Sequence, residues 1–234
     1  FVDGRDLREV QARAGGPLAE AGVLKWARQV CDALIYLHSQ APAVIHRDIK
    51  PANLRLTAQE EIFLVDFGLA KVYTADMPTT AGARGATRGY SPPEQYVGAR
   101  TDERSDIYAL GATLYNLLTG QVPVESMRRL HDDPLPLPRS LNPALSSHTE
   151  QVILRAMAPL RDDRFQSALA MRRALGEPAV GRPSPLGRWH WPAVGLALAV
   201  LILGACLCGG VLWLVVQRGG IQPLGLAQAW RWNG

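Results

Sequence analysis

Two polar segments, separated by a short apolar run, restrict the fold of this chain more than any other feature. The first contains Asp48 and Asn53, five positions apart, and the second contains Asp66, thirteen positions after Asn53. A turn, a short hairpin and a second turn can therefore bring these three side chains together. A carboxylate that orients a hydroxyl, beside an amide and a second carboxylate that hold Mg²⁺, suits phosphoryl transfer. The spacing predicts a phosphate-handling site built from two loops.

The residues around these positions resemble the motifs of the eukaryotic-type protein kinases. His46 to Asn53 reads His-Arg-Asp-Ile-Lys-Pro-Ala-Asn and is similar to the catalytic loop of that family. Asp66 to Gly68 reads Asp-Phe-Gly, which is similar to the metal-binding loop. A lone Asp-Phe-Gly is a weak signal because such triplets recur in ordinary turns. The two motifs in order are far more specific.

Further matches follow at the spacing of the family. Gly89 to Glu94 resembles the closing Ala-Pro-Glu segment, and Asp106 lies where the family has a buried helix aspartate. Arg164 matches the arginine that pairs with the closing glutamate. The resemblance implies structural roles: a buried Glu94–Arg164 ion pair, and an Asp106 carboxylate that accepts backbone N–H groups of the catalytic loop. It covers residues 1–175, and Phe1 to Leu7 resembles the end of the kinase hinge.

The resemblance also assigns chemical roles. It implies that Asp48 orients the substrate hydroxyl and accepts its proton, and that Lys50 contacts the transferred phosphoryl group. A lysine two positions after the catalytic aspartate is typical of serine/threonine kinases, whereas tyrosine kinases lack it. Asn53 and Asp66 would bind the Mg²⁺ that accompanies ATP.

Other residues near the expected nucleotide site are assigned by the same resemblance. Leu54, Phe67 and Gly68 would shape the nucleotide site and the metal-binding loop, and His46 would stack with Phe67 in a structural role. Arg55 departs from the pattern, because the family usually has an apolar residue under the adenine ring. Its guanidinium could stack beneath the base, or it could turn away and leave the neighbouring leucines to form the pocket.

The polar stretch between the two groups of motifs is typical of a regulatory loop. Thr79 and Thr80, fifteen and fourteen positions before Glu94, are candidate phosphorylation sites. Arg47 would receive the phosphate through paired hydrogen bonds. Thr87 resembles the substrate-side threonine that bonds to the catalytic aspartate and lysine, and we do not expect it to be phosphorylated.

Apolar periodicity predicts a mainly α-helical large lobe with a short β-hairpin. Helices are expected over Leu18–His38, Ile107–Leu118, Val152–Met157 and Ala168–Leu175. The hairpin is expected from Leu54 and Leu56 pairing with Ile62–Val65. Four prolines between Asp132 and Pro143 predict an extended connector.

The last quarter of the chain has a different composition. Residues 176–188 are rich in Pro and Gly and predict a linker, and no charged residue occurs from Trp189 through Gln217. A helix over residues 191–216 is long enough to cross the ~30 Å hydrocarbon core. A buried soluble helix is the alternative, but such helices rarely run this long without a charge. We expect a single transmembrane helix, with a short extracytoplasmic tail at 217–234.

The sequence gives less information about the orientation of the chain in the membrane and about its oligomeric state. The kinase resemblance favours a cytoplasmic lobe, since ATP and Mg²⁺ are cytoplasmic, and so predicts a single-pass protein of the cell membrane. Ala205 and Gly209 form a small-xxx-small pair that could support a homodimer through the membrane helix. The net charge of +4, without a block of Lys or Arg, gives no indication of nucleic-acid binding. Three cysteines give no disulfide framework.

These observations favour a membrane-anchored serine/threonine protein kinase that transfers the γ-phosphate of ATP to protein substrates. The sequence contains no Gly-x-Gly-x-x-Gly motif. We therefore expect the amino-terminal lobe to be missing and this polypeptide alone to transfer little phosphate. The alternative is a truncated kinase, or pseudokinase, that serves as a membrane-tethered docking or regulatory module. A plain membrane protein that only resembles a kinase is a third, less specific interpretation.

Overall fold

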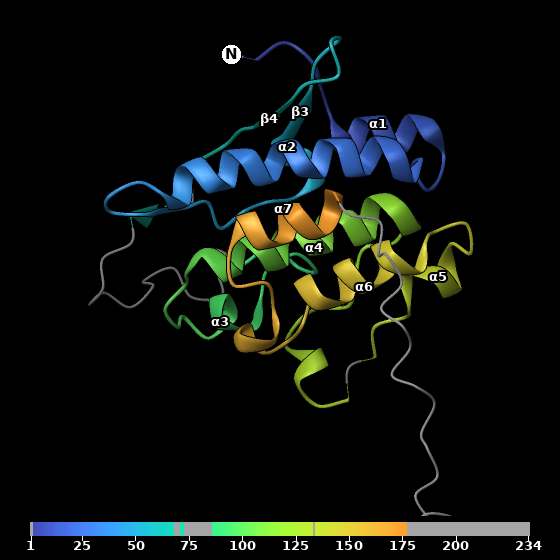
Figure 1. The fold of residues 1–234 in the computed structure, drawn as a ribbon. Coiled ribbons are helices and arrows are strands. Elements are labelled where there is room, and N and C mark those ends of the chain that lie inside the picture. Colours follow the sequence, from blue (N-terminus) through green and yellow to red (C-terminus); the bar gives the residue numbers. More distant parts are fainter. Residues whose placement is uncertain (1, 68–70, 73–85, 133, 177–234) are drawn as a thin grey trace, which may run out of the picture. The chain divides into compact units, whose positions relative to one another are not determined.

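A computed structural model describes residues 2–67, 71–72, 86–132 and 134–176 of the chain (Figure 1). The expected membrane span at 191–216, the tail at 217–234 and all but the first residue of the linker lie outside these residues. So do Gly68, Thr79 and Thr80. None of the helices in the described ranges is long and apolar enough to cross a membrane.

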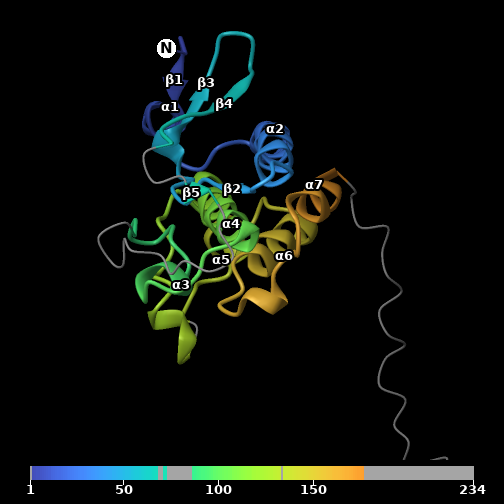
Figure 2. The same ribbon diagram turned by 90° about the vertical axis from the view of Figure 1, so that its left-hand side faces the viewer.

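The described part is mainly helical. Its α-helices are α1 (Leu7–Ala14), α2 (Glu20–His38), α3 (Pro93–Tyr96), α4 (Glu103–Thr119), α5 (Pro138–Leu141), α6 (Ser147–Ala156) and α7 (Ala168–Gly176). Its 3₁₀ turns are η1 (Pro51–Asn53), η3 (Arg128–Leu130) and η4 (Arg161–Asp163). Helix α2 packs along α7 and α4, and α6 packs along α4, as Figures 1 and 2 show.

Five short strands form two small sheets. The strands are β1 (Arg5–Asp6), β2 (Val44–Ile45), β3 (Leu54–Leu56), β4 (Ile62–Leu64) and β5 (Lys71–Val72). Antiparallel β1, β3 and β4 lie in that order, and β2 pairs with β5. The side chain of Gln29 on α2 fastens the hairpin, because its Oε1 accepts from the Ile62 N–H at 2.8 Å and its Nε2 donates to the Glu60 carbonyl at 3.3 Å. The expected hairpin of β3 and β4 is confirmed.

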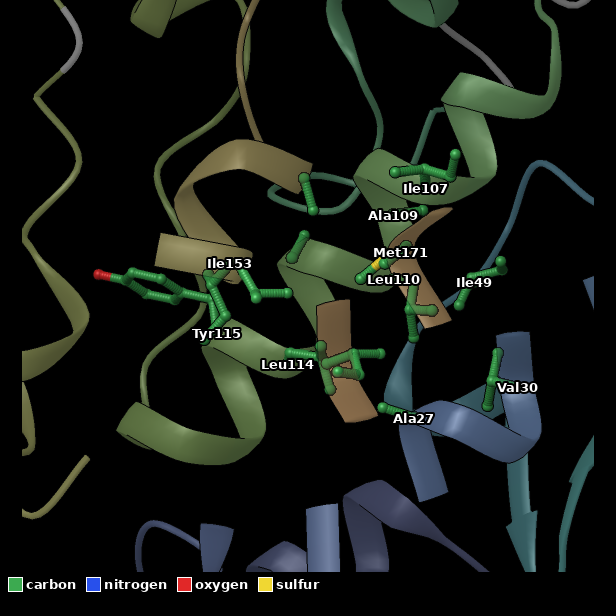
Figure 3. Close-up of a cluster of buried hydrophobic side chains, with 14 of the residues drawn as sticks. Ala27, Val30, Ile49, Ile107, Ala109, Leu110, Leu114, Tyr115, Ile153 and Met171 are labelled. Atoms are coloured by element: carbon green, nitrogen blue, oxygen red, sulfur yellow. The ribbon is translucent and has the colours of Figure 1, made fainter. Parts of the chain in front are cut away.

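Helix α4 forms the centre of the core and is buried from Ser105 to Thr119. Its apolar residues meet Ala27 and Val30 of α2, Ile153 of α6 and Met171 of α7 (Figure 3). Each fully buried leucine or isoleucine contributes about 1.5–3 kcal/mol relative to an exposed one. Gly111 allows α6 to come close, because a Cβ there would lie 2.8 Å from the Cβ of Ala156.

Sequence determines both ends of α4. The Asp102 side chain accepts from the Arg104 N–H, and Ser105 completes a capping box. At the other end, Gly120 adopts φ 77°, a left-handed conformation that glycine takes without steric cost. The helix therefore begins at Glu103, four residues before the predicted start at Ile107. The prediction followed the apolar residues, and the first turn of α4 is polar.

Three other expectations need correction. Helix α6 begins at Ser147, where the Ser146 side chain accepts from the Thr149 N–H, rather than at Val152. Helix α1 was not predicted. The connector from Asp132 to Pro143 was predicted as extended throughout, which is wrong for Pro138–Leu141, the residues of α5. Proline fits the first position of a helix, where its missing N–H has no intrahelical partner to lose.

Candidate active site

The Asp48 carboxylate is the centre of the candidate site. It accepts two hydrogen bonds from Lys50 Nζ, at 2.9 and 2.8 Å, and one from Thr87 Oγ1 at 2.7 Å. Lys50 Nζ also lies 3.3 Å from Thr87 Oγ1. Thr87 is 39 positions from Asp48 in sequence, so this contact is made only by the fold. The arrangement is the one expected for Thr87.

Asn53 fixes the same carboxylate from the other side. Its Nδ2 donates to the Asp48 backbone carbonyl at 2.8 Å and to Asp48 Oδ2 at 2.9 Å. Both amide hydrogens are thus used on Asp48, which leaves the Asn53 Oδ1 lone pairs for another partner. The Val65 N–H donates to the Asn53 carbonyl at 3.0 Å and so places Asp66 at the same end of the hairpin.

The donor set fits a magnesium ion. Asp66 is exposed and has φ 64°, an uncommon conformation that aspartate tolerates better than most residues. Amide and carboxylate oxygens are suitable ligands for Mg²⁺. Within the described ranges no group of three or more His, Cys, Asp or Glu side chains could hold a metal by itself. Mg²⁺ is usually bound by one or two protein carboxylates together with substrate phosphates and water.

Asp106 holds the backbone of the catalytic loop. This fully buried carboxylate accepts from the His46 N–H at 2.9 Å and from the Arg47 N–H at 2.8 Å, as expected. It also contacts His38 Nε2 at 2.9 Å, a residue that the sequence reasoning missed. Gln95, likewise missed, donates its Nε2 to the Arg47 carbonyl at 3.0 Å. These bonds stabilise the backbone of Arg47 at φ 72°, a conformation that residues other than glycine rarely adopt.

The His46 ring contacts the loop that contains Asp66 and Phe67. It lies 4.9 Å from the ring of Phe67 in an edge-to-face arrangement, which confirms the expected ring contact between the two loops. Burial lowers the pKa of His46, although the carboxylates of Asp106, Asp48 and Asp66 act in the opposite direction. Burial also lowers the pKa of Arg47, against the attraction of Asp106.

The turn from Thr87 to Ser91 fixes the position of Thr87. Its N–H donates to Ser91 Oγ at 2.9 Å, and its carbonyl accepts from the Tyr90 N–H at 3.0 Å. Gly89 between them has φ 83°, and a Cβ at that position would lie 2.6 Å from a methyl carbon of Val122. Any larger residue would push this turn outward and move the Thr87 hydroxyl away from Asp48.

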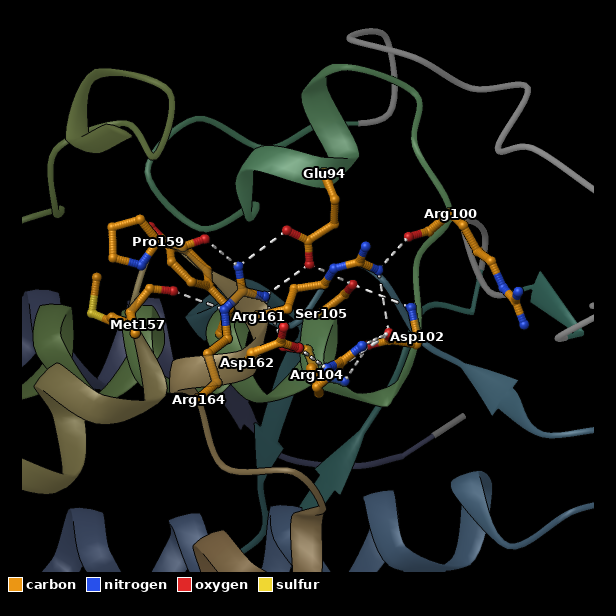
Figure 4. Close-up of polar contacts among 12 residues, drawn as sticks. Glu94, Arg100, Asp102, Arg104, Ser105, Met157, Pro159, Arg161, Asp162 and Arg164 are labelled. Carbon is orange, nitrogen blue, oxygen red and sulfur yellow. Dashed lines mark hydrogen bonds and ion pairs between the residues drawn. The ribbon is translucent and has the colours of Figure 1, made fainter. Parts of the chain in front are cut away.

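Glu94 and Arg164 form a second polar cluster (Figure 4). Arg164 Nη1 donates to Glu94 Oε1 at 2.8 Å and Nη2 donates to Oε2 at 3.1 Å, so the expected ion pair is present and bidentate. The arginine is completely buried. Ser105 Oγ donates to Glu94 Oε1 at 2.9 Å, which ties α3 to the start of α4. Ser105 was not recognised from the sequence.

Comparison with known proteins agrees with this geometry. The sequence profile described as "Protein kinase domain" matches residues 1–153. The chain belongs to the protein kinase family. It is 41% identical to the serine/threonine-protein kinase Pkn1 of Myxococcus xanthus over 186 residues, 75% of this chain and 26% of that protein. It is 33% identical to PknB of Mycobacterium tuberculosis over 192 residues, 78% of this chain and 30% of PknB.

Solved structures of other proteins have a similar fold. The PknI kinase domain of Mycobacterium tuberculosis superposes with a TM-score of 0.58 at 32% identity, covering 75% of this chain and 63% of the solved kinase-domain chain. The apo form of PpkA-294 gives a TM-score of 0.62 at 27% identity, covering 75% of this chain and 61% of that one. The kinase-like fold is therefore confirmed. The chain spans less than a third of the length of its two curated relatives.

The residues expected to face the nucleotide are described only in part. Leu54 is buried in β3 directly after Asn53. Arg55 Nη1 donates to the Gly4 carbonyl at 2.9 Å, so its guanidinium is fastened to the hinge-like first segment. Gly68 and the candidate phosphorylation sites Thr79 and Thr80 lie outside the described residues.

Proposed function

We propose that this chain forms the catalytic lobe of an ATP- and Mg²⁺-dependent serine/threonine protein kinase that acts on protein substrates. The observation that carries the proposal is the convergence of Lys50, Asn53 and Thr87 on the single carboxylate of Asp48. A carboxylate held by an ammonium, an amide and a hydroxyl has a fixed direction, which is what positioning a reacting hydroxyl requires. The match to a kinase family profile and to bacterial serine/threonine kinases supports the same activity.

In this proposal a substrate hydroxyl binds beside the Asp48 carboxylate, which Thr87 Oγ1 and Lys50 Nζ hold in place. The hydroxyl oxygen forms a bond to the γ-phosphorus, the bond from that phosphorus to the oxygen of the departing ADP breaks, and the hydroxyl proton passes to Asp48. Lys50 stabilises the negative charge of the transferred group with its ammonium. Asn53 and Asp66 would hold Mg²⁺, which would offset the negative charge of the nucleotide phosphates.

We also propose regulation through the loop that precedes Thr87. Phosphorylated Thr79 or Thr80 would bring nearly two negative charges to Arg47. Because Asp106 holds the Arg47 backbone at 2.8 Å, such a contact would act directly on the catalytic loop.

For location we propose a single-pass protein of the cell membrane with a cytoplasmic kinase lobe. The uncharged stretch over residues 191–216 and the need for ATP support this arrangement. The small-xxx-small pair in that stretch supports a homodimer in the membrane. Protease treatment of sealed spheroplasts tests the topology: the lobe should be protected and become sensitive only after lysis.

Radiolabelled ATP and phosphoamino-acid analysis test the activity, with protein expressed from its complete coding sequence. We expect phosphoserine or phosphothreonine, and a requirement for a divalent ion. Asp66→Asn should abolish labelling. Asp162→Asn is a matched control, since Asp162 is 94% exposed and lies in the separate Glu94–Arg164 region. Labelling of Asp66→Asn at the wild-type rate, or labelling confined to tyrosine, would contradict the proposal.

A further inference from the structure

A pocket of about 420 Å³ lies on the lobe away from the Asp48 carboxylate. Ala43 and Ile45 form its apolar wall, and its polar wall contains His38 at the end of α2 and Glu103 at the start of α4. Its volume is within the usual range for small-molecule sites, about 300–1,000 Å³. The mechanism proposed above uses none of these four residues.

His38 contributes an unsatisfied hydrogen-bonding atom. Its side chain is only 6% exposed, and its Nε2 contacts Asp106 Oδ2 at 2.9 Å. Asp106 also accepts two backbone N–H groups, as an ionised carboxylate does, so Nε2 donates in this contact. In the neutral imidazole Nδ1 is then an acceptor. Nδ1 is buried and has no hydrogen-bond partner within the described residues, although leaving such a group unpaired costs about 1–3 kcal/mol.

Glu103 contributes an unpaired charge. Its half-buried carboxylate takes part in no hydrogen bond or ion pair with any residue that the structure describes. The other polar groups on this wall are already engaged. Arg104 binds Asp102, Asp162 and Gln166, and the Gln166 amide donates to three backbone carbonyls.

We propose that this pocket binds a small aliphatic amine of the diamine or polyamine class. The polar wall carries the unpaired, negatively charged Glu103 carboxylate together with His38, so a protonated amine complements it. The Ala43 and Ile45 wall can pack against the methylene chain of such a ligand. An anion would meet the Glu103 carboxylate, and a neutral diol would leave its charge uncompensated.

The pocket is connected to the catalytic loop through one residue. His38 lines the pocket, and Asp106, its partner, also holds the His46 and Arg47 N–H groups immediately before Asp48. An amine that packs against His38 would shift the imidazole that contacts Asp106 and should alter hydrogen exchange at those two amides. The binding site is therefore an effector site, and its occupancy does not depend on phosphoryl transfer.

Isothermal titration calorimetry of the full chain in a non-ionic detergent tests the site, with 1,4-diaminobutane as the probe. Measurement at pH 8 and about 0.15 M salt keeps the probe protonated and screens non-specific surface attraction. We expect saturable 1:1 binding and no binding of 1,4-butanediol, which has nearly the same shape without the charge. Glu103→Gln should weaken diamine binding at least tenfold. Glu61→Gln is a matched control, because Glu61 is exposed on the β3–β4 turn and lines no part of this pocket.

Hydrogen exchange of the same samples tests the connection to the catalytic loop. Added diamine should change exchange at the His46 and Arg47 amides in the wild type and in Glu61→Gln, but much less in Glu103→Gln. Absence of saturable binding, equal binding by Glu103→Gln, or equal binding of the diol would overturn the site. Binding without any change at these amides would overturn its effector role. Circular dichroism of each variant confirms that the fold is intact.

Discussion

Arg164 reaches Glu94 with two parallel hydrogen bonds of 2.8 and 3.1 Å, although the two residues are 70 positions apart. The same guanidinium donates to the carbonyls of Ala158, Pro159 and Arg104 and lies over the ring of Tyr108. One buried side chain therefore joins α3, α4 and the segment between α6 and α7.

Removing this arginine should destabilise the protein severely. Arg164→Met removes the only cation paired with the buried Glu94 carboxylate among the described residues, leaving it the Ser105 hydroxyl, and also removes a donor to three carbonyls. It should lower the free energy of unfolding by about 3–5 kcal/mol. Glu94→Gln should cost less, because Arg164 keeps its carbonyl partners. Urea unfolding followed by tryptophan fluorescence gives both values. Arg161→Met is the control: its ion pair with Asp102 is partly exposed and should contribute about 0–1 kcal/mol. Equal losses in Arg164→Met and Arg161→Met would contradict the account.

Asp106 should control the order of the catalytic loop. In Asp106→Asn one oxygen becomes an NH₂ group that faces a backbone N–H donor, so either His46 or Arg47 loses its acceptor. We expect a loss of stability of about 1–3 kcal/mol, and faster hydrogen exchange at these two amides than elsewhere in the core. Asp32→Asn on the exposed face of α2 should leave that exchange unchanged. A uniform increase across all amides would indicate a general loss of stability instead.

Thr87 should act through its hydroxyl. Thr87→Val removes the bond to Asp48 while keeping the shape of the side chain, and Thr87→Ser keeps the bond. A hydrogen bond to a charged group is worth about 1.5–3 kcal/mol, or roughly a 10- to 150-fold change in rate. We therefore expect kcat to fall at least tenfold in Thr87→Val and by much less in Thr87→Ser. Similar kcat values for the two variants would show that the hydroxyl is not used.

The contribution of Glu20 to the stability of the fold should be lost at acid pH. Burial alone raises the pKa of Glu20, but hydrogen bonds from Ser146 and Thr149 outweigh it and leave the pKa below its ordinary value. Since the folded-state pKa is the lower one, the stabilisation is complete above the ordinary pKa, about 4.3. It is lost as the pH falls through the folded-state value.

Urea unfolding between pH 3 and pH 7 tests this linkage. Glu20→Gln should cost about 0.5–1.5 kcal/mol at pH 7 and show a smaller loss of stability on acidification than the wild type. In a Ser146→Ala background, Glu20→Gln should have less effect at pH 7, because one of its partners is already absent. An unchanged acid-dependent loss in Glu20→Gln would exclude this carboxylate as its source.

The convergence of Asp48 and Asn53 could be predicted from their spacing. The contacts of Asp106 with His46 and Arg47 were expected only from the resemblance to the kinase family. Periodicity found α2 and the buried part of α4 but not the polar first turn of α4. His38 could not be assigned because its partner is 68 positions away, and a histidine at the end of a helix has no distinctive local pattern. The contact of Glu20 with Ser146 spans 126 positions and depends entirely on how α2 and α6 pack. Four prolines concealed α5, since proline disfavours a helix interior but not its first position.

The rate of phosphate transfer by Asp48→Asn is the most direct test of the central claim, that this carboxylate orients the reacting hydroxyl. Asparagine keeps the size of the side chain and can still bind Lys50 and Thr87, but it cannot accept a proton. With radiolabelled ATP, and with protein expressed from its complete coding sequence, we predict a loss in kcat of about 10²–10⁴-fold, with Asp162→Asn unchanged. A variant with asparagine at position 48 that labels a protein substrate as fast as the wild type would contradict the account.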